Sequence, residues 1–272
     1  MIYSIVKTLS RPISVAVFLF LAWPIGAVEQ PGVWETLLKE SYFKGVNILE
    51  DNAVIELEAP YRAEDPALTP LSIKAQIPQT PERYIERIHV IVDRNPQPLA
   101  GVFHLTPAMG KADLAMRIRI DQYTPVRTIA VLNNGEHHMA TQFVKASGGC
   151  SAPPPAYLEA AMQRLGQMRF KTVREEVAGE PTRAQFMVSH PNITGMQIDP
   201  ITRNYIPEHY VKRIAISYND KPLMTAELGS SLSADPALGF FFKPEETGTI
   251  KAEVMDSKGL QWSQSFAVNG QF

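Results

Sequence analysis

The one cysteine of the chain, Cys150, is the residue best suited to covalent chemistry. It follows Gly148 and Gly149, and three consecutive prolines begin at Pro153. A thiol with no partner in its own chain is either buried and inert, or free to react with something outside the chain. Glycines have maximal backbone freedom and no side chain to pack, so this segment favours an exposed connector. We therefore predict a reactive thiol on an exposed connector, in which Gly148 and Gly149 supply backbone freedom.

The neighbourhood of Cys150 also favours ionisation of the thiol. Residues 156–168 are rich in helix-forming types, so a helix is expected to start near Pro155. The positive end of the helix dipole and the nearby Lys145 would both lower the pKa of the thiol. Because the thiolate is the nucleophilic form, a lowered pKa would help it capture a sulfur electrophile.

The histidines are weaker candidates. His137 and His138 are adjacent on an expected strand, so their side chains should point to opposite faces, and a shared metal ion is not expected. His190 and His209 lie in expected loops. Either one could approach Cys150 and form a Cys–His pair, although a solvated or capping histidine is the ordinary interpretation.

The remaining polar motifs point away from catalysis. Glu64 and Asp65 precede Pro66, a pattern that indicates a turn rather than an acid–base pair. The sequence has no glycine-rich phosphate loop, no His/Cys cluster with metal spacing and no nucleophile elbow. We accordingly predict no metal ligands, no cofactor and no catalytic residues of the chain's own.

Composition limits the class of protein. The chain has 272 residues, 45% of them hydrophobic, which is enough for a substantial core without disulfides or a metal. The net charge of −2 gives no basic footprint for nucleic acid. Proline, at 22 residues, outnumbers glycine, at 16, which favours short strands and turns over long helices.

The N-terminus has the pattern of a secretory signal peptide. Lys7 and Arg11 precede a short apolar run, residues 13–22, and the small residues Gly26 and Ala27 follow it. The run is about half the ~20 residues that a spanning helix needs, so we expect no stable membrane insertion. We predict a signal peptide over residues 1–27, with an uncleaved anchor as the alternative.

Alternation of apolar and polar residues predicts strands along most of the chain. Below residue 150 the alternating runs are 55–59, 88–92, 99–105, 114–120, 128–132 and 139–143, with a tight turn at Asn134-Gly135. Above it the runs are 184–188, 214–218, 250–254 and 262–268. This density of strands is typical of β-sandwiches. The fold class is thus all-β, with two immunoglobulin-like sandwiches joined by a proline-rich, partly helical linker.

The predicted organisation has four parts. Residues 1–27 are the signal peptide, 28–147 the first sandwich, 148–178 the cysteine arm and linker helix, and 179–272 the second sandwich. The hairpin sequences that begin at Arg87 and Arg213 echo each other, followed by Pro98-Leu99 and Pro222-Leu223 respectively. Duplication of one domain and convergence on a common hairpin pattern both explain this weak repeat.

Several motifs resemble those of SoxY and SoxZ, the two subunits of the carrier in bacterial sulfur oxidation. Gly148-Gly149-Cys150 matches the start of the Gly-Gly-Cys-Gly-Gly arm of SoxY, and residues 59–66 and 69–71 resemble its early segment. Residues 190–195 (HPNITG) and 205–210 (YIPEHY) resemble two stretches of SoxZ. The chain is therefore similar to a fused SoxY–SoxZ carrier, of the type associated with quinoprotein dehydrogenases.

That resemblance implies a fold and a function. The family fold is two immunoglobulin-like sandwiches, and the family function is that of a carrier rather than an enzyme. Cys150 would hold a sulfur intermediate covalently in the periplasm, as in thiosulfate oxidation, while Gly148 and Gly149 let the arm enter partner enzymes. The implied partners are periplasmic sulfur-oxidation enzymes or a quinoprotein dehydrogenase system.

The chain departs from the family pattern after the cysteine. Ser151-Ala152 replaces the second glycine pair, and the arm is internal, so it is tethered at both ends. A loop needs a wider channel than a free tail, so the partners and cargo could differ from those of thiosulfate oxidation. Three interpretations follow: a covalent carrier, an adaptor for a periplasmic dehydrogenase in which Cys150 is not essential, and a thiol enzyme. An exposed thiol would also allow a Cys150-linked homodimer.

Overall fold

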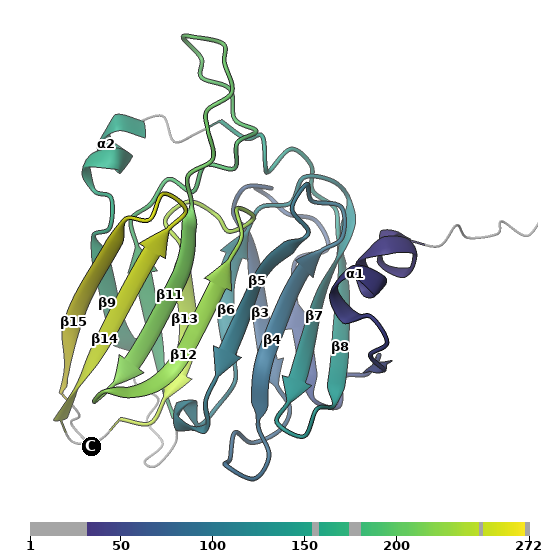
Figure 1. Ribbon diagram of the computed structural model, residues 1–272, viewed down its shortest axis with the longest axis vertical. Helices are drawn as coiled ribbons and strands as arrows, with labels where there is room; N and C mark the ends of the chain where they lie inside the picture. The colour runs from purple at the N-terminus through teal and green to yellow at the C-terminus, as the bar shows by residue number, and fades with distance from the viewer. Residues whose placement is uncertain (1–31, 154–157, 174–180, 245–246, 270–272) are drawn as a thin grey trace, which may run out of the picture.

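Two long β-sheets and a few short helices make up the computed structural model, which describes residues 32–153, 158–173, 181–244 and 247–269 (Figure 1). The predicted signal peptide lies outside the described residues. The elements in chain order are η1 (Trp34–Leu38), α1 (Lys39–Phe43), β1 (Ile48–Leu49), β2 (Ile55–Glu58), β3 (Thr69–Ala75), β4 (Ile85–Val92), β5 (Leu99–Leu105), η2 (Pro107–Met109), β6 (Leu114–Ile118), β7 (Thr124–Leu132), β8 (His137–Val144), α2 (Leu158–Gln163), β9 (Met168–Val173), β10 (Thr182–Val188), β11 (Val211–Tyr218), β12 (Lys221–Leu228), β13 (Ala237–Phe242), β14 (Thr247–Asp256) and β15 (Gln261–Asn269).

The two halves share both sheets. The nine-stranded sheet has the order β1-β8-β7-β4-β5-β12-β11-β14-β15, and the six-stranded sheet has the order β2-β3-β6-β13-β10-β9. β5 pairs with β12 antiparallel over five residues, and β6 meets β13 at the Ala115–Gly239 pair. The all-β class and the two immunoglobulin-like sandwiches are confirmed, and the sandwiches are joined edge to edge along this seam.

The repeated hairpins lie side by side at the seam. β4-β5 and β12-β11 are neighbours in the larger sheet, with β7-β8 beyond β4, β14-β15 beyond β11, and the short β1 added at the β8 edge only. One apolar core runs between the sheets through both halves, from Ile88 and Phe103 to Phe240 and Ile250, all fully buried. Because this core is continuous, the halves should unfold together rather than as independent domains.

The linker differs from its prediction. The expected helix over residues 156–168 is reduced to α2, Leu158–Gln163, while residues 154–157 lie outside the described part of the chain. Gly166 takes a positive φ of 78°, and Met168 already starts β9. β9 pairs along its whole length with β10, and Phe170 packs on Phe240. The second sandwich therefore includes a strand that the boundary at residue 179 left in the linker.

An N-terminal helical segment, which strand patterning does not predict, covers the larger sheet. Trp34, Leu38 and Phe43 of η1 and α1 bury themselves against Ile91 and Ile129 on its outer face. The Arg127 guanidinium lies 4.8 Å from the Trp34 ring. No helix among the described residues is both long and apolar enough to cross a membrane.

Candidate functional site: the Cys150 arm and its clasp

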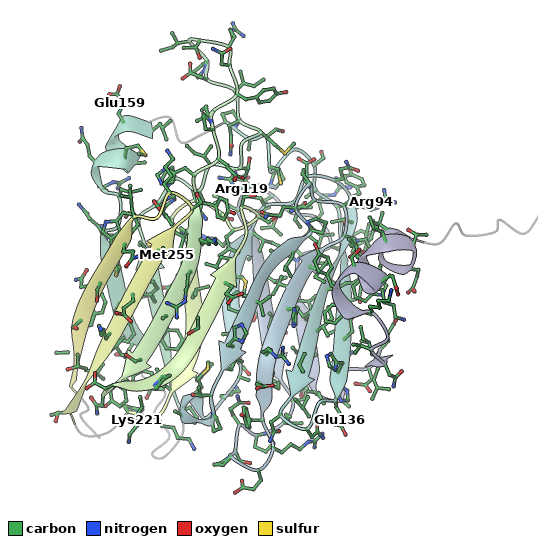
Figure 2. The ribbon with its side chains drawn as sticks, viewed as in Figure 1. Arg94, Arg119, Glu136, Glu159, Lys221 and Met255 are labelled. Carbon is green, nitrogen blue, oxygen red and sulfur yellow. The ribbon has the colours of Figure 1, made fainter. Side chains whose placement is uncertain are left out.

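The arm that carries Cys150 contacts Arg119, which lies at the end of the sandwich where loops of both halves meet (Figure 2). On the first half, the backbone N–H groups of Gly148 and Gly149 donate to the carbonyls of Asp121 and Ile120, at 2.8 and 2.9 Å. On the second half, the hydroxyl of Thr194 donates to the Cys150 carbonyl at 2.6 Å. Both halves of the chain therefore hold the arm.

The thiol of Cys150 is buried between the two halves of the chain. Its residue is only 3% exposed, against the prediction of an exposed connector. Burial, reinforced by the negative charge of Asp121 and opposed by Arg119, raises the pKa of the Cys150 thiol to about 12. The prediction of a lowered pKa is wrong for this conformation, because the distant residues that close over the arm outweigh any helix dipole.

Gly149 is required by a close approach as much as by flexibility. A Cβ atom on Gly149 would lie 2.2 Å from the carbonyl oxygen of Pro66 and 2.6 Å from that of Ile120, so only glycine fits. Gly148 takes a φ of +78°, a left-handed conformation that glycine adopts without strain. The glycine pair therefore lets the backbone seat against the first half. Its role in swinging the arm stays a prediction.

Arg119, which is not among the predicted site residues, is a charged group that hydrogen-bonds the arm. Its guanidinium donates from Nη1 to the Gly149 carbonyl at 3.0 Å and from Nη2 to the Asn192 carbonyl at 3.4 Å. The side chain is only 3% exposed, and burial lowers its pKa. Its Nε atom has no hydrogen-bond partner among the described residues. Arg119 thus bridges the arm to the loop that starts at His190, a role with no local sequence signal.

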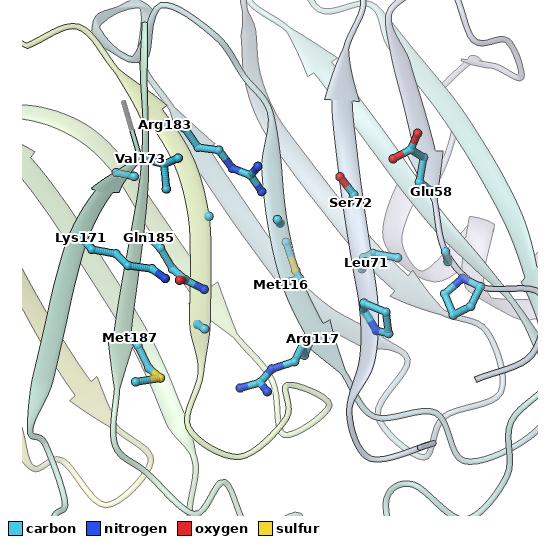
Figure 3. Close-up of a pocket in the computed structure, with 17 residues that line it drawn as sticks. Glu58, Leu71, Ser72, Met116, Arg117, Lys171, Val173, Arg183, Gln185 and Met187 are labelled. Atoms are coloured by element: carbon cyan, nitrogen blue, oxygen red, sulfur yellow. The ribbon is translucent and has the colours of Figure 1, made fainter. Parts of the chain in front are cut away.

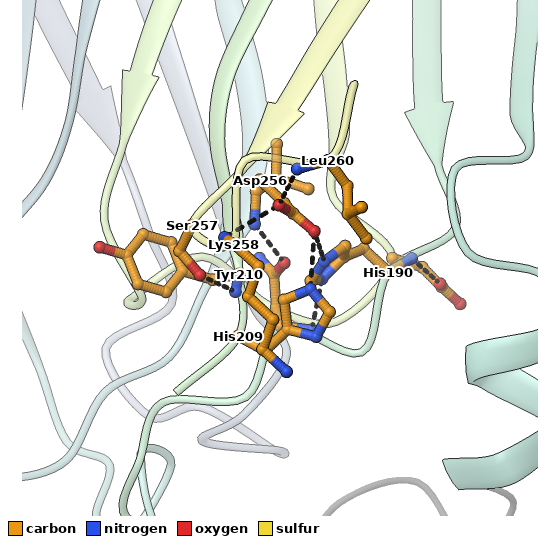
Figure 4. A network of polar contacts seen from close by, with 10 residues as sticks. His190, His209, Tyr210, Asp256, Ser257, Lys258 and Leu260 are labelled. Atoms are coloured by element: carbon orange, nitrogen blue, oxygen red, sulfur yellow. Dashed lines mark hydrogen bonds and ion pairs between the residues drawn. The ribbon is translucent and has the colours of Figure 1, made fainter. Parts of the chain in front are cut away.

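His209 hydrogen-bonds Asp256, and His190 lies beside the same carboxylate; neither histidine contacts Cys150 (Figure 4). His209 Nε2 lies 2.6 Å from Asp256 Oδ2, and His190 Nε2 lies 3.7 Å from the same oxygen. The two rings meet edge to face, with centroids 4.6 Å apart. Within the described chain, the charged groups that act on the thiol are Asp121 and Arg119, so the alternative of a Cys–His pair is not formed.

Electrostatics in this network favour a neutral histidine beside a charged carboxylate. Burial, followed by repulsion from His209, lowers the pKa of His190 to about 4. For Asp256, burial alone would raise the pKa. Hydrogen bonds from His209 and from the backbone N–H groups of Leu260 and Lys258 reverse that effect and lower it. The network therefore pins both ends of the loop between His190 and His209 to the end of β14.

The same three residues offer ligand atoms for a metal ion, within 4.8 Å of one another. The hydrogen bonding argues against that use. The backbone N–H of Asn192 donates to His190 Nδ1 at 3.0 Å, so a neutral His190 carries its proton on Nε2, the atom a metal would need. Metal-bound histidines normally donate from their second nitrogen instead of accepting there. The group suits a buried hydrogen-bond network.

The other candidates take structural roles. Asp65 accepts a hydrogen bond from the Ala67 backbone N–H at 2.8 Å, which confirms the turn. His138 Nδ1 lies 3.0 Å from Asp51 Oδ1, whereas His137 contacts the Phe43 ring, so the adjacent histidines take different partners. Lys145 Nζ lies over the Tyr61 ring at 4.7 Å.

A separate open groove crosses the seam on the outer face of the six-stranded sheet (Figure 3). Its volume is about 970 Å³, and its floor includes the small residues Ala115 and Gly239. Arg117, Lys171 and Arg183 line it. Cys150 is not among the lining residues, so the groove is distinct from the thiol site.

Comparisons with known proteins match both halves separately. Residues 39–150 match the model of the sulfur oxidation protein SoxY, and residues 168–267 match that of the sulphur oxidation protein SoxZ. No curated protein sequence matches the chain. The SoxY match ends at Cys150 itself, in agreement with the arm motif.

Solved structures resemble the chain only loosely. The sulfur carrier protein SoxY from Chlorobium limicola f thiosulfatophilum is 24% identical, with a TM-score of 0.32, over 40% of this chain and 88% of its own. Fibronectin(III)-like modules of Clostridium thermocellum CbhA are 10% identical, with a TM-score of 0.23, over 78% of this chain and 93% of their own. These TM-scores lie below 0.5, so the assignment depends on the tandem sequence matches. A SoxY domain followed by a SoxZ domain in one polypeptide makes this chain a member of the SoxY–SoxZ family, as a fusion of the two.

Proposed function

We propose that the protein is a periplasmic carrier that holds a sulfur-containing intermediate on Cys150 and has no turnover of its own. The supporting observation is the position of the Gly-Gly-Cys segment, which lies where the SoxY and SoxZ halves meet and is held by both. Its seat needs glycine at position 149, so the backbone is shaped around this segment.

The buried thiol fits a carrier with two states. In the closed state described here, the raised pKa keeps Cys150 protonated and unreactive. The arm is held by hydrogen bonds, each of which contributes ~0.5–1.5 kcal/mol, so a local opening is accessible without unfolding the sandwich. Opening would return the thiol to water and to an ordinary pKa.

Loading would proceed by exchange at sulfur. The Cys150 thiolate attacks one sulfur of an S–S bond in the donor; a new S–S bond forms at Sγ as the old one breaks. The electron pair of the broken bond leaves with the second sulfur, which takes a proton from water. The exchange consumes no external oxidant, and its reversal by a partner's thiol would unload the arm.

Family membership and the predicted signal peptide support a location and a set of partners for the carrier. We infer that the carrier works in the periplasm with sulfur-oxidation enzymes, or with a quinoprotein dehydrogenase system as its motifs suggest. Copurification of the native protein distinguishes the two: recovery of sulfur-oxidising enzymes without a dehydrogenase would count against the second system.

The decisive experiment measures the intact mass of the protein isolated from its native periplasm, with and without reductant, and maps Cys150 by peptide analysis. A reductant-sensitive adduct on Cys150 supports the carrier and begins to identify the cargo. In the host, Cys150→Ser should abolish function while leaving the melting temperature unchanged. A clean free thiol under active metabolism would refute the proposal.

One observation favours a second candidate. A cysteine that is 3% exposed with a pKa near 12 is also what an inert structural residue looks like. In that case the protein is an adaptor for a periplasmic dehydrogenase, and Cys150→Ser would be silent in the host.

A further inference from the structure

A long loop projects from the end of the sandwich that carries the arm. This finger, defined here as residues 194–207, rises above the loops around it, between β10 and β11 (Figure 1). Its base is closed by reciprocal backbone hydrogen bonds between Ile193 and His209, at 2.7 and 2.9 Å, and by the Asp256 network described above. The finger is therefore anchored firmly at both ends.

The upper part of the finger exposes large apolar side chains. Ile201 is 89% exposed, Tyr205 69% and Ile198 49%. Ile198 and Tyr205 face each other across an isolated β-bridge, so their side chains lie next to each other. Single exposed apolar residues are ordinary, but a cluster on a projection is typical of an interaction site.

The finger is also ordered from within. Asp199 Oδ1 accepts the backbone N–H groups of Ile201 and Thr202, at 2.9 and 2.7 Å. Backbone hydrogen bonds join Asp199 to Asn204 and Ile206 to Gln197, each at 2.9 Å. A pre-ordered apolar projection loses little conformational entropy on binding, which favours docking.

The base of the finger contacts the arm directly. Thr194, its first residue, donates to the Cys150 carbonyl at 2.6 Å. Ile201, at the tip, is seven residues further along, so the tip lies within roughly 24 Å of that contact at ~3.4 Å per residue. A protein that grips the tip is thereby brought to the mouth of the thiol site.

Charge limits the kind of partner. The finger has one acidic residue, Asp199, and one basic residue, Arg203, so it is neutral overall. Segments that bind anionic membrane surfaces normally combine apolar residues with clusters of lysine and arginine. A neutral apolar tip fits an apolar recess in a protein better than a lipid surface.

We propose that the finger is the docking element for the enzymes that act on cargo held by Cys150, and that its apolar tip, Ile198, Ile201 and Tyr205, inserts into an apolar recess beside their active-site entrance. This inference depends on the proposed carrier function for the identity of the partner. The geometry of the finger itself does not depend on that function.

The test follows removal of the Cys150 adduct by a host periplasmic extract, measured by intact mass at increasing concentrations of adduct-bearing carrier. The double variant Ile201→Ser, Tyr205→Ser should lose its adduct at least about tenfold more slowly at low carrier concentration, with the rate at saturation unchanged. The substitutions remove two apolar contacts that stabilise the docked complex and leave the chemistry at Cys150 intact. The control is Leu37→Ser, a 58% exposed leucine on η1, which should behave as the wild type.

A crosslinking experiment distinguishes failure of docking from failure of the carrier function. A photoreactive p-benzoylphenylalanine replaces Ile201 or, separately, Ser151 beside the thiol, in the host. The expected result is one covalent product with the same protein from both positions, in the wild type and with Cys150→Ser. That product without any Cys150 adduct would leave docking standing and refute the carrier.

Three results would overturn the docking proposal. One is adduct removal from the double variant at the wild-type rate. A second is sedimentation showing a wild-type dimer that the double variant abolishes, which makes the tip a contact between copies of this chain. The third is binding to vesicles of phosphatidylethanolamine and phosphatidylglycerol that is lost in the double variant, which makes the tip a lipid anchor.

Discussion

Removal of one hydrogen bond should open the arm measurably. In the closed state four hydrogen bonds hold residues 148–150: two to the carbonyls of Ile120 and Asp121, one from Arg119 and one from Thr194. At ~0.5–1.5 kcal/mol each, they favour the closed arm by roughly 2–6 kcal/mol. The thiol should therefore react about 30 to 25,000 times more slowly than in an unfolded chain.

The perturbation is Thr194→Val, which keeps the β-branched shape and deletes the hydroxyl that donates to the Cys150 carbonyl. The other contacts of this hydroxyl, with Gln197 Oε1 and the Met196 N–H, lie within the finger and do not hold the arm. Loss of ~1 kcal/mol from the closed state raises the open population about fivefold. The rate of Cys150 alkylation should rise by the same factor, because the reagent reaches the thiol only through the open state.

The assay measures alkylation by N-ethylmaleimide at pH 7.5, by intact mass, with the chain in guanidinium as the reference for an accessible thiol. The control is Thr172→Val, an exposed threonine on β9 away from the arm, which should react as the wild type. Either of two results refutes the reasoning: a wild-type rate equal to that in guanidinium, or an unchanged rate in a folded Thr194→Val protein.

Further predictions concern the same region. Burial raises the pKa of Cys150 from 9.0 to about 12, so the neutral thiol stabilises the closed arm below pH 9, and that stabilisation is lost between pH 9 and 12. The alkylation rate of the folded protein should therefore keep rising over this range, after the rate of the unfolded chain has levelled off. Gly149→Ala places a Cβ 2.2 Å from the Pro66 carbonyl oxygen, so the arm should fail to seat and the thiol should react near the reference rate, with far-ultraviolet circular dichroism unchanged. Asp256→Asn weakens the buried carboxylate contact with His209 at 2.6 Å and should lower the free energy of unfolding by about 2–5 kcal/mol in urea titration; an unchanged midpoint would contradict this role.

Local patterns predicted the strands because a half-buried strand records its environment in its own residues. On β4, Ile88 and Val90 flank the polar His89, and both face the core between the sheets. β13 was not predicted, because its run of Leu238, Phe240, Phe241 and Phe242 is buried almost throughout and does not alternate. The length of the linker helix was also not predictable from local pattern, because the helix ends where β9 pairs with β10.

The environment of Cys150 could not be predicted in this way. The glycine pair and the prolines indicate an exposed segment, and the groups that bury it come from elsewhere in the chain. The carbonyl groups of Pro66 and Ile120 lie against Gly149 on one side, and Thr194 hydrogen-bonds the Cys150 carbonyl on the other. Each lies at least 30 residues from the cysteine in sequence, so no window around residue 150 contains the cause of the raised pKa.

The fusion of the two domains gives the SoxZ half a physical role in handling the thiol. The SoxY half supplies the cysteine and the carbonyl groups that lie against Gly149, but Thr194 belongs to the SoxZ half, and so does Asn192, whose carbonyl accepts from Arg119. The same loop continues into the finger. A partner that binds the finger and displaces it would therefore also displace Thr194 from the Cys150 carbonyl. Docking would then favour opening of the arm next to the bound partner.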